Sequence, residues 1–199
     1  MAGRLSEGDL ERAAEAIADD QGLDGVTMSS VATRLGVRPP SLYGHVADRG
    51  GLLDRLSAHA LERLADDLSV AVAGRSGPAA LRAFADTHRT FARRSPGLWA
   101  ALHRPVPPGS PGVAAGRRIS TLTAAILGAY PIPEDDLVHA IRLLGAAVNG
   151  WIALERAGGF AHSAPDADAS WTRSLQALDA LFAAWPTAAS SAVTKETPR

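Results

Sequence analysis

Apolar residues recur at intervals of three and four positions along most of this chain, and glycine or proline interrupts them at a few places. This spacing is typical of amphipathic helices, because residues at i, i+3 and i+4 share one helix face. Two stripes in the N-terminal part are Leu10, Ala13, Ala14 and Ile17, and then Leu52, Leu53, Leu56, Ala60, Leu64 and Leu68. They predict a first helix and a long linking helix that ends near the Gly-Arg-Ser-Gly-Pro run at 74–78.

The rest of the chain repeats the pattern in five further predicted helices. These span residues 78–94, 98–103, 113–127, 134–157 and 166–185. The segment 104–112 holds four prolines and is predicted to be a loop. Residues 187–199 are rich in alanine, serine and threonine, so we expect this tail to be disordered. The patterning therefore predicts an all-α fold.

A short segment, from Thr27 to about residue 46, has the pattern of two helices joined by a tight turn. Thr27 is placed to cap the first helix, and Gly36 follows it where a helix end needs a left-handed residue. Pro39 opens the second predicted helix, 38–46, because proline at a first helical position loses no hydrogen bond. Leu42 and Val46 then face inward. The residues left outside are Ser41, Tyr43, Gly44 and His45. A helix-turn-helix places such a face in the major groove of DNA.

This segment resembles the N-terminal domain of the tetracycline-repressor (TetR) family of transcriptional regulators. The family string G-V-x-x-x-x-L-Y-x-H-[FV]-x-x-[KR]-x-x-L is matched by Gly36, Val37, Leu42, Tyr43, His45, Val46, Arg49 and Leu52. The likeness covers about the first 55 residues. A second and less specific likeness covers residues 149–160, which are similar to a segment of some TetR-like C-terminal domains. The resemblance implies a three-helix DNA-binding domain followed by a helical bundle with an inducer pocket.

The chemistry of the exposed side chains assigns them to two kinds of DNA contact. Phosphate contacts position the protein without reading sequence, and their candidates are Thr27, Tyr43, His45 and Arg49. Base edges are left to Arg38, Pro40 and Ser41. Two alternatives stay open, because Tyr43 can instead be a half-buried packing residue and Arg38 a solvated charge in a turn. The family commonly has a small capping residue in place of Arg38 and a larger one in place of Gly44, so the predicted reading surface is small.

Charge argues mildly against a nucleic-acid partner. The whole chain has a formal net charge of −1, and residues 1–50 hold five arginines against eight acidic residues. Between Arg34 and Arg49, however, three arginines face only Asp48. A sequence-independent DNA-packing protein needs a basic domain, so this class is disfavoured. We expect modest phosphate contact per subunit and therefore a dimer.

Several other classes of protein are disfavoured by what the sequence lacks. There are no cysteines, which rules out disulfides and cysteine-based zinc sites. The signatures of zinc proteases, serine hydrolases, phosphate-binding loops and dinucleotide sites are missing, so we expect no enzyme and no cofactor. No apolar run approaches the ~20 residues of a membrane helix, and the N-terminus lacks the apolar core of a signal peptide. We expect a soluble cytoplasmic protein without membrane contact.

The C-terminal helices hold candidates for a ligand pocket and for a dimer interface. An apolar cavity with a few polar groups is predicted where these residues converge: Phe84, His88, Phe91, Trp99, Leu102, His103, Leu122, Ile126 and Val148. Core packing is the equal alternative for each of them singly, and the cavity rests on the resemblance. No second ligand at metal-site spacing accompanies His88 or His103, so no metal site is predicted. The predicted dimer interface is Gly145, Asn149, Ala153, Leu175, Leu178 and Phe182.

Together these patterns predict a helix-turn-helix domain at 1–50 and a helical ligand-binding and dimerisation domain at 51–186. The predicted function is a homodimeric, sequence-specific DNA-binding regulator. We expect a repressor that a small apolar ligand releases from a palindromic operator in double-stranded DNA. Two alternatives remain, a non-enzymatic helical protein-interaction module and a regulator that has no small-molecule ligand.

Overall fold

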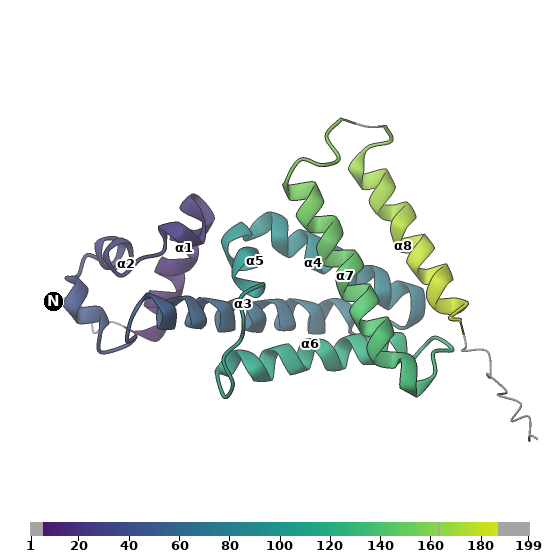
Figure 1. Ribbon diagram of the computed structural model, residues 1–199, viewed down its shortest axis with the longest axis horizontal. Coiled ribbons are helices and arrows are strands. Elements are labelled where there is room, and N and C mark those ends of the chain that lie inside the picture. The colour runs from purple at the N-terminus through teal and green to yellow at the C-terminus, as the bar shows by residue number, and fades with distance from the viewer. Residues whose placement is uncertain (1–5, 163, 187–199) are drawn as a thin grey trace, which may run out of the picture.

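A computed structural model describes residues 6–162 and 164–186, and over these ranges all of its regular secondary structure is helical (Figure 1). The α-helices are α1 (Glu7–Gly25), α2 (Met28–Leu35), α3 (Arg49–Val72), α4 (Gly77–Arg94), α5 (Pro96–Leu102), α6 (Pro111–Leu127), α7 (Leu137–Arg156) and α8 (Ala167–Ala183). Two 3₁₀ helices are η1 (Pro39–Leu42) and η2 (Glu134–Asp136). The all-α prediction is confirmed. The predicted disorder of residues 187–199 lies outside the described residues.

The first two helices form as local sequence dictates. Ser6 and Asp9 make a capping box at the start of α1, in which the Ser6 N–H donates to the Asp9 carboxylate at 2.9 Å. The predicted stripe of α1 is buried, and the helix is kinked at Gly22, which has a φ of 74°. Thr27 caps α2, and Gly36 ends it in the left-handed conformation with a φ of 67°. The predicted turn is therefore present.

The second helix of the predicted pair is shorter and tighter than expected. It is the single 3₁₀ turn Pro39–Leu42, followed by a turn at 43–45, instead of a helix over 38–46. Its hydrogen bonds are of the i to i+3 kind, from the Ser41 N–H to the Arg38 carbonyl at 2.9 Å and from the Tyr43 N–H to the Pro40 carbonyl at 3.4 Å, and the next residue, Gly44, has weak helix propensity. Leu42 and Val46 still point into the core, with exposed fractions of 0% and 6%.

The long helix α3 runs from the helix-turn-helix into the rest of the molecule. All six apolar residues of its predicted stripe are buried. They belong to one continuous hydrophobic core that includes residues of α1 and α2 on one side and of α4 to α8 on the other. In Figure 1, α3 lies along the long axis with α1 and α2 at one end, α5 near its middle and α6 running beside it.

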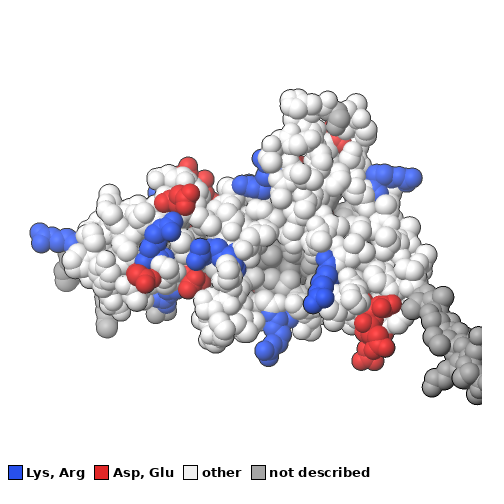
Figure 2. Space-filling model, in the orientation of Figure 1, with Lys and Arg blue, Asp and Glu red and all other residues white. Residues whose placement is uncertain are grey.

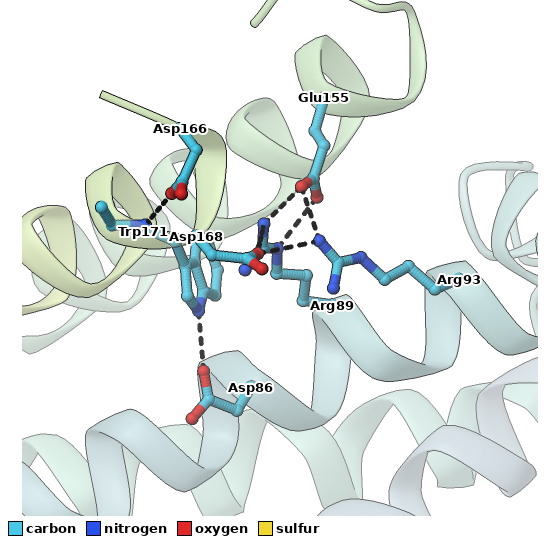
Figure 3. A network of polar contacts seen from close by, with 8 residues as sticks. Asp86, Arg89, Arg93, Glu155, Asp166, Asp168 and Trp171 are labelled. Atoms are coloured by element: carbon cyan, nitrogen blue, oxygen red, sulfur yellow. Dashed lines mark hydrogen bonds and ion pairs between the residues drawn. The ribbon is translucent and has the colours of Figure 1, made fainter. Parts of the chain in front are cut away.

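Helix α8 is held against the subunit by polar contacts as well as by its buried face. The Trp171 indole N–H donates to Asp86 of α4 at 2.7 Å (Figure 3). Arg89 of α4, which is 6% exposed, bonds Glu155 of α7 and lies 2.7 Å from Asp168 of α8. This network raises the pKa of Arg89 chiefly through its hydrogen bond to Glu155, and that bond lowers the pKa of Glu155.

One described segment, Glu134–Arg156, is long and apolar enough to cross a membrane by length and composition alone. Its most apolar window has a mean hydropathy of 1.5, so the expectation that no run approaches this length is wrong. This is weak evidence for a membrane, because the helix carries Glu155 in a network with Arg89 and packs against α4, α6 and α8. Only 22% of that window is buried within the subunit, so most of this apolar helix faces outward.

Candidate DNA-binding site and core of the C-terminal helices

The predicted DNA-contacting residues share the end of the molecule formed by α2 and η1. Arg38, Pro40 and Ser41 are exposed, and 57% of Tyr43 is open to solvent. His45 is half-buried, and its backbone carbonyl accepts from Arg55 at 3.1 Å. The structure thus brings these side chains together on one outward-facing turn, as a reading element requires.

Thr27 is already engaged at the start of α2. Its hydroxyl oxygen accepts from the Ser30 N–H at 3.0 Å, and its own N–H donates to the Ser30 hydroxyl at 2.9 Å. The Ser30 hydroxyl in turn donates to the Gly25 carbonyl at 2.7 Å. This box fixes the first turn of α2. The N–H groups that stay free in this turn are of the kind that binds phosphate at a helix N-terminus.

Arg49 has structural partners that its predicted phosphate role did not include. Its Nε donates to the Val26 carbonyl at 2.8 Å, and its Nη2 donates to the Leu23 carbonyl at 2.9 Å. The first turn of α3 is thereby tied to the link between α1 and α2. Because these contacts join residues more than twenty positions apart, no local pattern announces them. Arg49 therefore positions the helix-turn-helix, and a phosphate has to share its guanidinium with two carbonyls.

Charges around the reading element are mixed, as the sequence predicts. On the face drawn in Figure 2, basic and acidic side chains alternate at the α1–α2 end and form no continuous basic patch. Arg34 lies 3.6 Å from Asp20, which weakens its pull on phosphate. The Arg38 carbonyl accepts from the Ser41 N–H at 2.9 Å, but within the described part of the chain its guanidinium has no hydrogen bond or ion pair and is therefore available to a partner.

The residues predicted to line a ligand cavity are mostly packed in the core. Buried members are Phe84, His88, Phe91, Trp99, Ile126 and Val148, whereas Leu102 and Leu122 are half-buried and His103 is exposed. His88 donates from Nδ1 to the Phe84 carbonyl at 2.9 Å, and the two rings are 4.3 Å apart. Burial lowers the pKa of His88 to about 4, so the imidazole is neutral at physiological pH.

Among the larger hollows in the described part of the structure, none is lined by more than one of these residues. Where members of the set border a hollow, they border three different ones: Phe91 an outer groove along α3 and α4, Leu122 a groove between α3 and α6, and Val148 a cleft between α7 and α8. The C-terminal turn of α6, which holds Ile126, lies far from α5 in Figure 1. Within the described residues, no group of three His, Asp or Glu side chains is arranged to hold a metal ion.

The predicted dimer stripe is divided between the core and the surface. Leu175 and Phe182 are 2% and 0% exposed, because they face inward within the subunit, and they are unavailable to a partner. The large apolar side chains that are open on these helices are instead Val138, Leu143 and Leu154 on α7 and Leu181 on α8, exposed by 52%, 38%, 56% and 41%. Of these, Leu181 lines a cleft of about 310 Å³ between α7 and α8, which also includes Leu178. Helical spacing alone did not distinguish these two faces.

Gly145, Asn149 and Ala153 lie beside this open surface on α7. Gly145 has open space at the position of a Cβ atom, and Ala153 is exposed. The Asn149 side-chain amide donates to the Gly145 carbonyl at 2.8 Å, so its polar group is satisfied within the helix. These three side chains are small and uncharged, so a second helix can approach closely here.

Two family models cover most of this architecture. The model described as bacterial regulatory proteins of the tetR family matches residues 10–56. The model described as the tetracyclin repressor-like C-terminal domain matches residues 81–178. The chain belongs to the TetR family. It is a helix-turn-helix transcriptional regulator, and the prediction that it is not an enzyme is confirmed.

Individual relatives of this TetR-family regulator agree with that assignment. The HTH-type transcriptional regulator YobS of Bacillus subtilis is 28% identical over 71% of this chain and 74% of its own length. The tetracycline repressor protein class D of Escherichia coli is 37% identical over 40% of this chain and 36% of its own. A Rhodococcus protein of solved structure and unknown function has a TM-score of 0.74 at 26% identity, over 88% of this chain and 94% of that one.

We expect substitutions of the reading element to separate the two kinds of DNA contact. Arg38→Ala should relax preference at one base position, because a guanidinium that grips guanine contributes about 1–3 kcal/mol of discrimination. Tyr43→Phe should weaken binding to all sequences alike, since it removes a donor to phosphate. Selection of duplexes from random DNA followed by titration measures both. A uniform loss for Arg38→Ala without a change in base preference would remove its readout role.

The buried imidazole of His88 makes stability depend on pH in a defined window. The unfolded chain takes up a proton at His88 near pH 6.5, whereas in the folded state its pKa is about 4. Acid therefore favours unfolding, and the free energy of unfolding should fall by roughly 3 kcal/mol between neutral pH and pH ~4 through this group. Denaturant titrations should show a correspondingly smaller acid loss in His88→Gln, which keeps a donor but does not titrate. Equal pH slopes for both proteins would contradict this account.

Proposed function

We propose that this TetR-family regulator is a homodimeric repressor that reads a palindromic operator and is released by a small, mostly apolar ligand. The observation that carries the proposal is the exposed turn at η1, where Arg38, Ser41 and Tyr43 project together from the end of an otherwise packed domain. Proteins of this family bind DNA operators and small-molecule ligands and form dimers. Regulators of this family are typically cytoplasmic, and we propose the same location for this protein.

On DNA, η1 lies in the major groove and the surrounding groups hold phosphates. Arg38 faces a base edge, while Pro40 and Ser41 supply a small apolar and hydroxyl surface beside it. The start of α2 at Thr27, together with Tyr43 and His45, contacts the sugar–phosphate backbone. A surface this small reads few base pairs per subunit. The two-fold symmetry of a dimer doubles the reading surface and predicts an operator with inverted half-sites.

The dimer forms through α7 and α8. Their outward faces carry the large apolar side chains Leu143, Leu154 and Leu181, next to the open face of Gly145, Asn149 and Ala153. Exposed apolar surface of this extent on two adjacent helices is typical of a protein–protein interface. Two helices from each subunit then make a four-helix interface. A partner subunit on this face explains why α7 is apolar on more than one side.

The ligand binds among the C-terminal helices and shifts the population toward a form whose reading elements no longer fit successive major grooves. The neutral His88 imidazole supplies a polar group within an otherwise apolar wall that includes Phe84. Among solved structures, a TetR variant of Acinetobacter baumannii was determined in complex with minocycline, and it matches 92% of this chain and 99% of its own at 24% identity, with a TM-score of 0.69. Because the core here is closed, ligand entry requires helices to separate.

The closed core also favours a second candidate, a regulator without a small-molecule ligand. Residues of the predicted pocket such as Phe84 and Ile126 are 3% and 4% exposed and fill the space between helices. A regulator of this second kind would respond to protein concentration alone. The helix-turn-helix domain proposed at 1–50 and the remainder at 51–186 keep their roles in both cases, with α3 crossing the boundary.

Selection of bound duplexes from random DNA with the purified protein tests DNA reading most directly. We expect an inverted repeat whose half-sites lie about one helical turn apart, or a multiple of this spacing. Enrichment of a single unrepeated half-site would argue against the dimeric mode of reading. Failure to enrich any sequence would contradict the proposal that the protein reads an operator.

Replacing Leu181 by arginine tests the proposed interface. Leu181 is 41% exposed in the subunit, so Leu181→Arg should leave the fold intact but bury an unpaired charge in the dimer, at a cost of about 3–5 kcal/mol. Sedimentation should show monomers, and helical content should be unchanged. Gln176→Arg is the matched control, because Gln176 is exposed on the other side of α8. A dimer of unaltered stability in Leu181→Arg would exclude this face.

Ile126→Trp tests whether the ligand space is present before the ligand arrives. The structure packs Ile126 at 4% exposure, so the larger side chain should destabilise the free protein by roughly 1–3 kcal/mol. Thermal and denaturant melts measure this loss. A variant as stable as the parent would instead indicate a preformed cavity, because only empty space accepts an indole without strain.

A further inference from the structure

At the start of α5, Gly97 packs directly against the backbone of α1. Gly97 lies so close to α1 that an added Cβ atom would come within 2.4 Å of the Ala18 carbonyl carbon and 2.6 Å of the Asp19 nitrogen. Ordinary van der Waals contact for such an atom begins at 3.4 Å. Since two of these atoms are backbone, no side-chain rotation can make room. Glycine is therefore required here by proximity, and its φ is not left-handed.

A hydrogen bond joins the same two segments at this contact. The Gly97 N–H donates to the Asp19 carboxylate at 2.6 Å, so an acid of α1 caps the first turn of α5 across 78 positions of sequence. Burial raises the pKa of the Asp19 carboxyl, which the hydrogen bond from Gly97 partly offsets. A desolvated carboxylate contributes little net stability, but its directional bond discriminates strongly between orientations.

The end of α7 reaches the same corner. Arg156 donates to the Ala92 carbonyl at 2.8 Å, near the end of α4, and its charge acts favourably on Asp19. The preceding residue, Glu155, belongs to the network with Arg89 and Arg93 (Figure 3). Contacts from α7, one of the two helices proposed to form the dimer, therefore hold the corner between α4 and α5.

We propose that Asp19 and Gly97 are positioning residues for DNA binding, which set the angle between the helix-turn-helix and the C-terminal helices. In a dimer this angle fixes the distance between the two reading elements, and hence the half-site spacing that the protein accepts. The inference rests on the dimeric operator reading proposed above. Neither residue contacts DNA in this scheme.

The helix-turn-helix connects to the rest of the chain through α3, and a single helix leaves rotation and bending about its axis open. The contact between α1 and α5 lies to the side of α3, so it removes that freedom. This contact leaves no room for adjustment, because the α1 backbone packs directly on Gly97. Ligand or partner effects that move the α4–α5 corner must therefore move α1 as well, since packed elements shift as units.

The experiment compares two disruptive variants with two matched controls. Gly97→Ala must push α1 and α5 apart by about 1 Å to restore ordinary contact, whereas Gly116→Ala adds the same methyl where a Cβ meets nothing within 4 Å. Asp19→Ala removes the cap, whereas Asp20→Ala removes an equal charge from the next residue, which is 64% exposed and lies 3.6 Å from Arg34, so that this control alters affinity through Arg34 but leaves the contact at Gly97 intact. Loss of negative charge alone would strengthen DNA binding in both aspartate variants.

The readout is affinity for a series of operators that differ only in the number of base pairs between half-sites. We expect Gly97→Ala and Asp19→Ala to lose about tenfold at the spacing preferred by the parent, because the competent orientation becomes a minor population, and to accept a broader or shifted set of spacings. The controls and Asp19→Asn, which keeps the acceptor oxygen, should retain the parental preference.

The outcomes separate this inference from the function on which it rests. If the parent protein prefers one spacing and both disruptive variants keep that preference, Asp19 and Gly97 are structural residues only and the inference is wrong, whatever their melting temperatures. If Gly97→Ala does not fold, Asp19→Ala decides the question by the same measurement. If the parent shows no preferred spacing, the dimeric reading of a palindrome fails first, and the inference fails with it.

Discussion

The buried stripe of α3 is the constraint on which the whole molecule depends. Leucines spaced along one helix, from Leu52 to Leu68, enter a core shared by the helix-turn-helix and the C-terminal helices. A helix that spans both parts transmits tilt along its length, since its hydrogen bonds make it stiffer than any loop. The packing is therefore continuous across the division proposed at residue 50.

Apolar packing and polar contacts have different tasks in this fold. Burial of side chains such as Phe91 and Leu144 supplies the driving force, which is large and non-directional. Direction comes from a few bonds between distant helices, such as those of Arg49, Arg89 and Trp171. Arg49 ties the start of α3 to the end of α1 and the link that follows it, whereas Arg89 and the partner of Trp171, Asp86, connect α4 to the end of α7 and the start of α8. These bonds hold the helices at defined angles, which non-directional apolar packing alone would not fix.

Sequence reasoning succeeded where structure is local. The Thr27 cap, the Gly36 turn and most helix positions depend on neighbours within a few residues and are as predicted, whereas the helix expected over 38–46 is only a 3₁₀ turn. It failed where two segments must meet. The partners of Arg49 and the inward orientation of Phe182 depend on which helix lies alongside, and spacing is silent on that choice. The family likeness identified the function but did not decide whether a pocket is open.

The double proline of η1 gives the reading element a thermodynamic character of its own. Pro39 and Pro40 fix two φ angles in the free protein, and the neighbouring Leu42 is anchored in the core. A flexible reading loop must surrender conformational entropy when it orders on a duplex. This turn has already surrendered that entropy during folding. A short surface with few contacts can therefore retain useful affinity, because almost none of its interaction energy is lost to ordering.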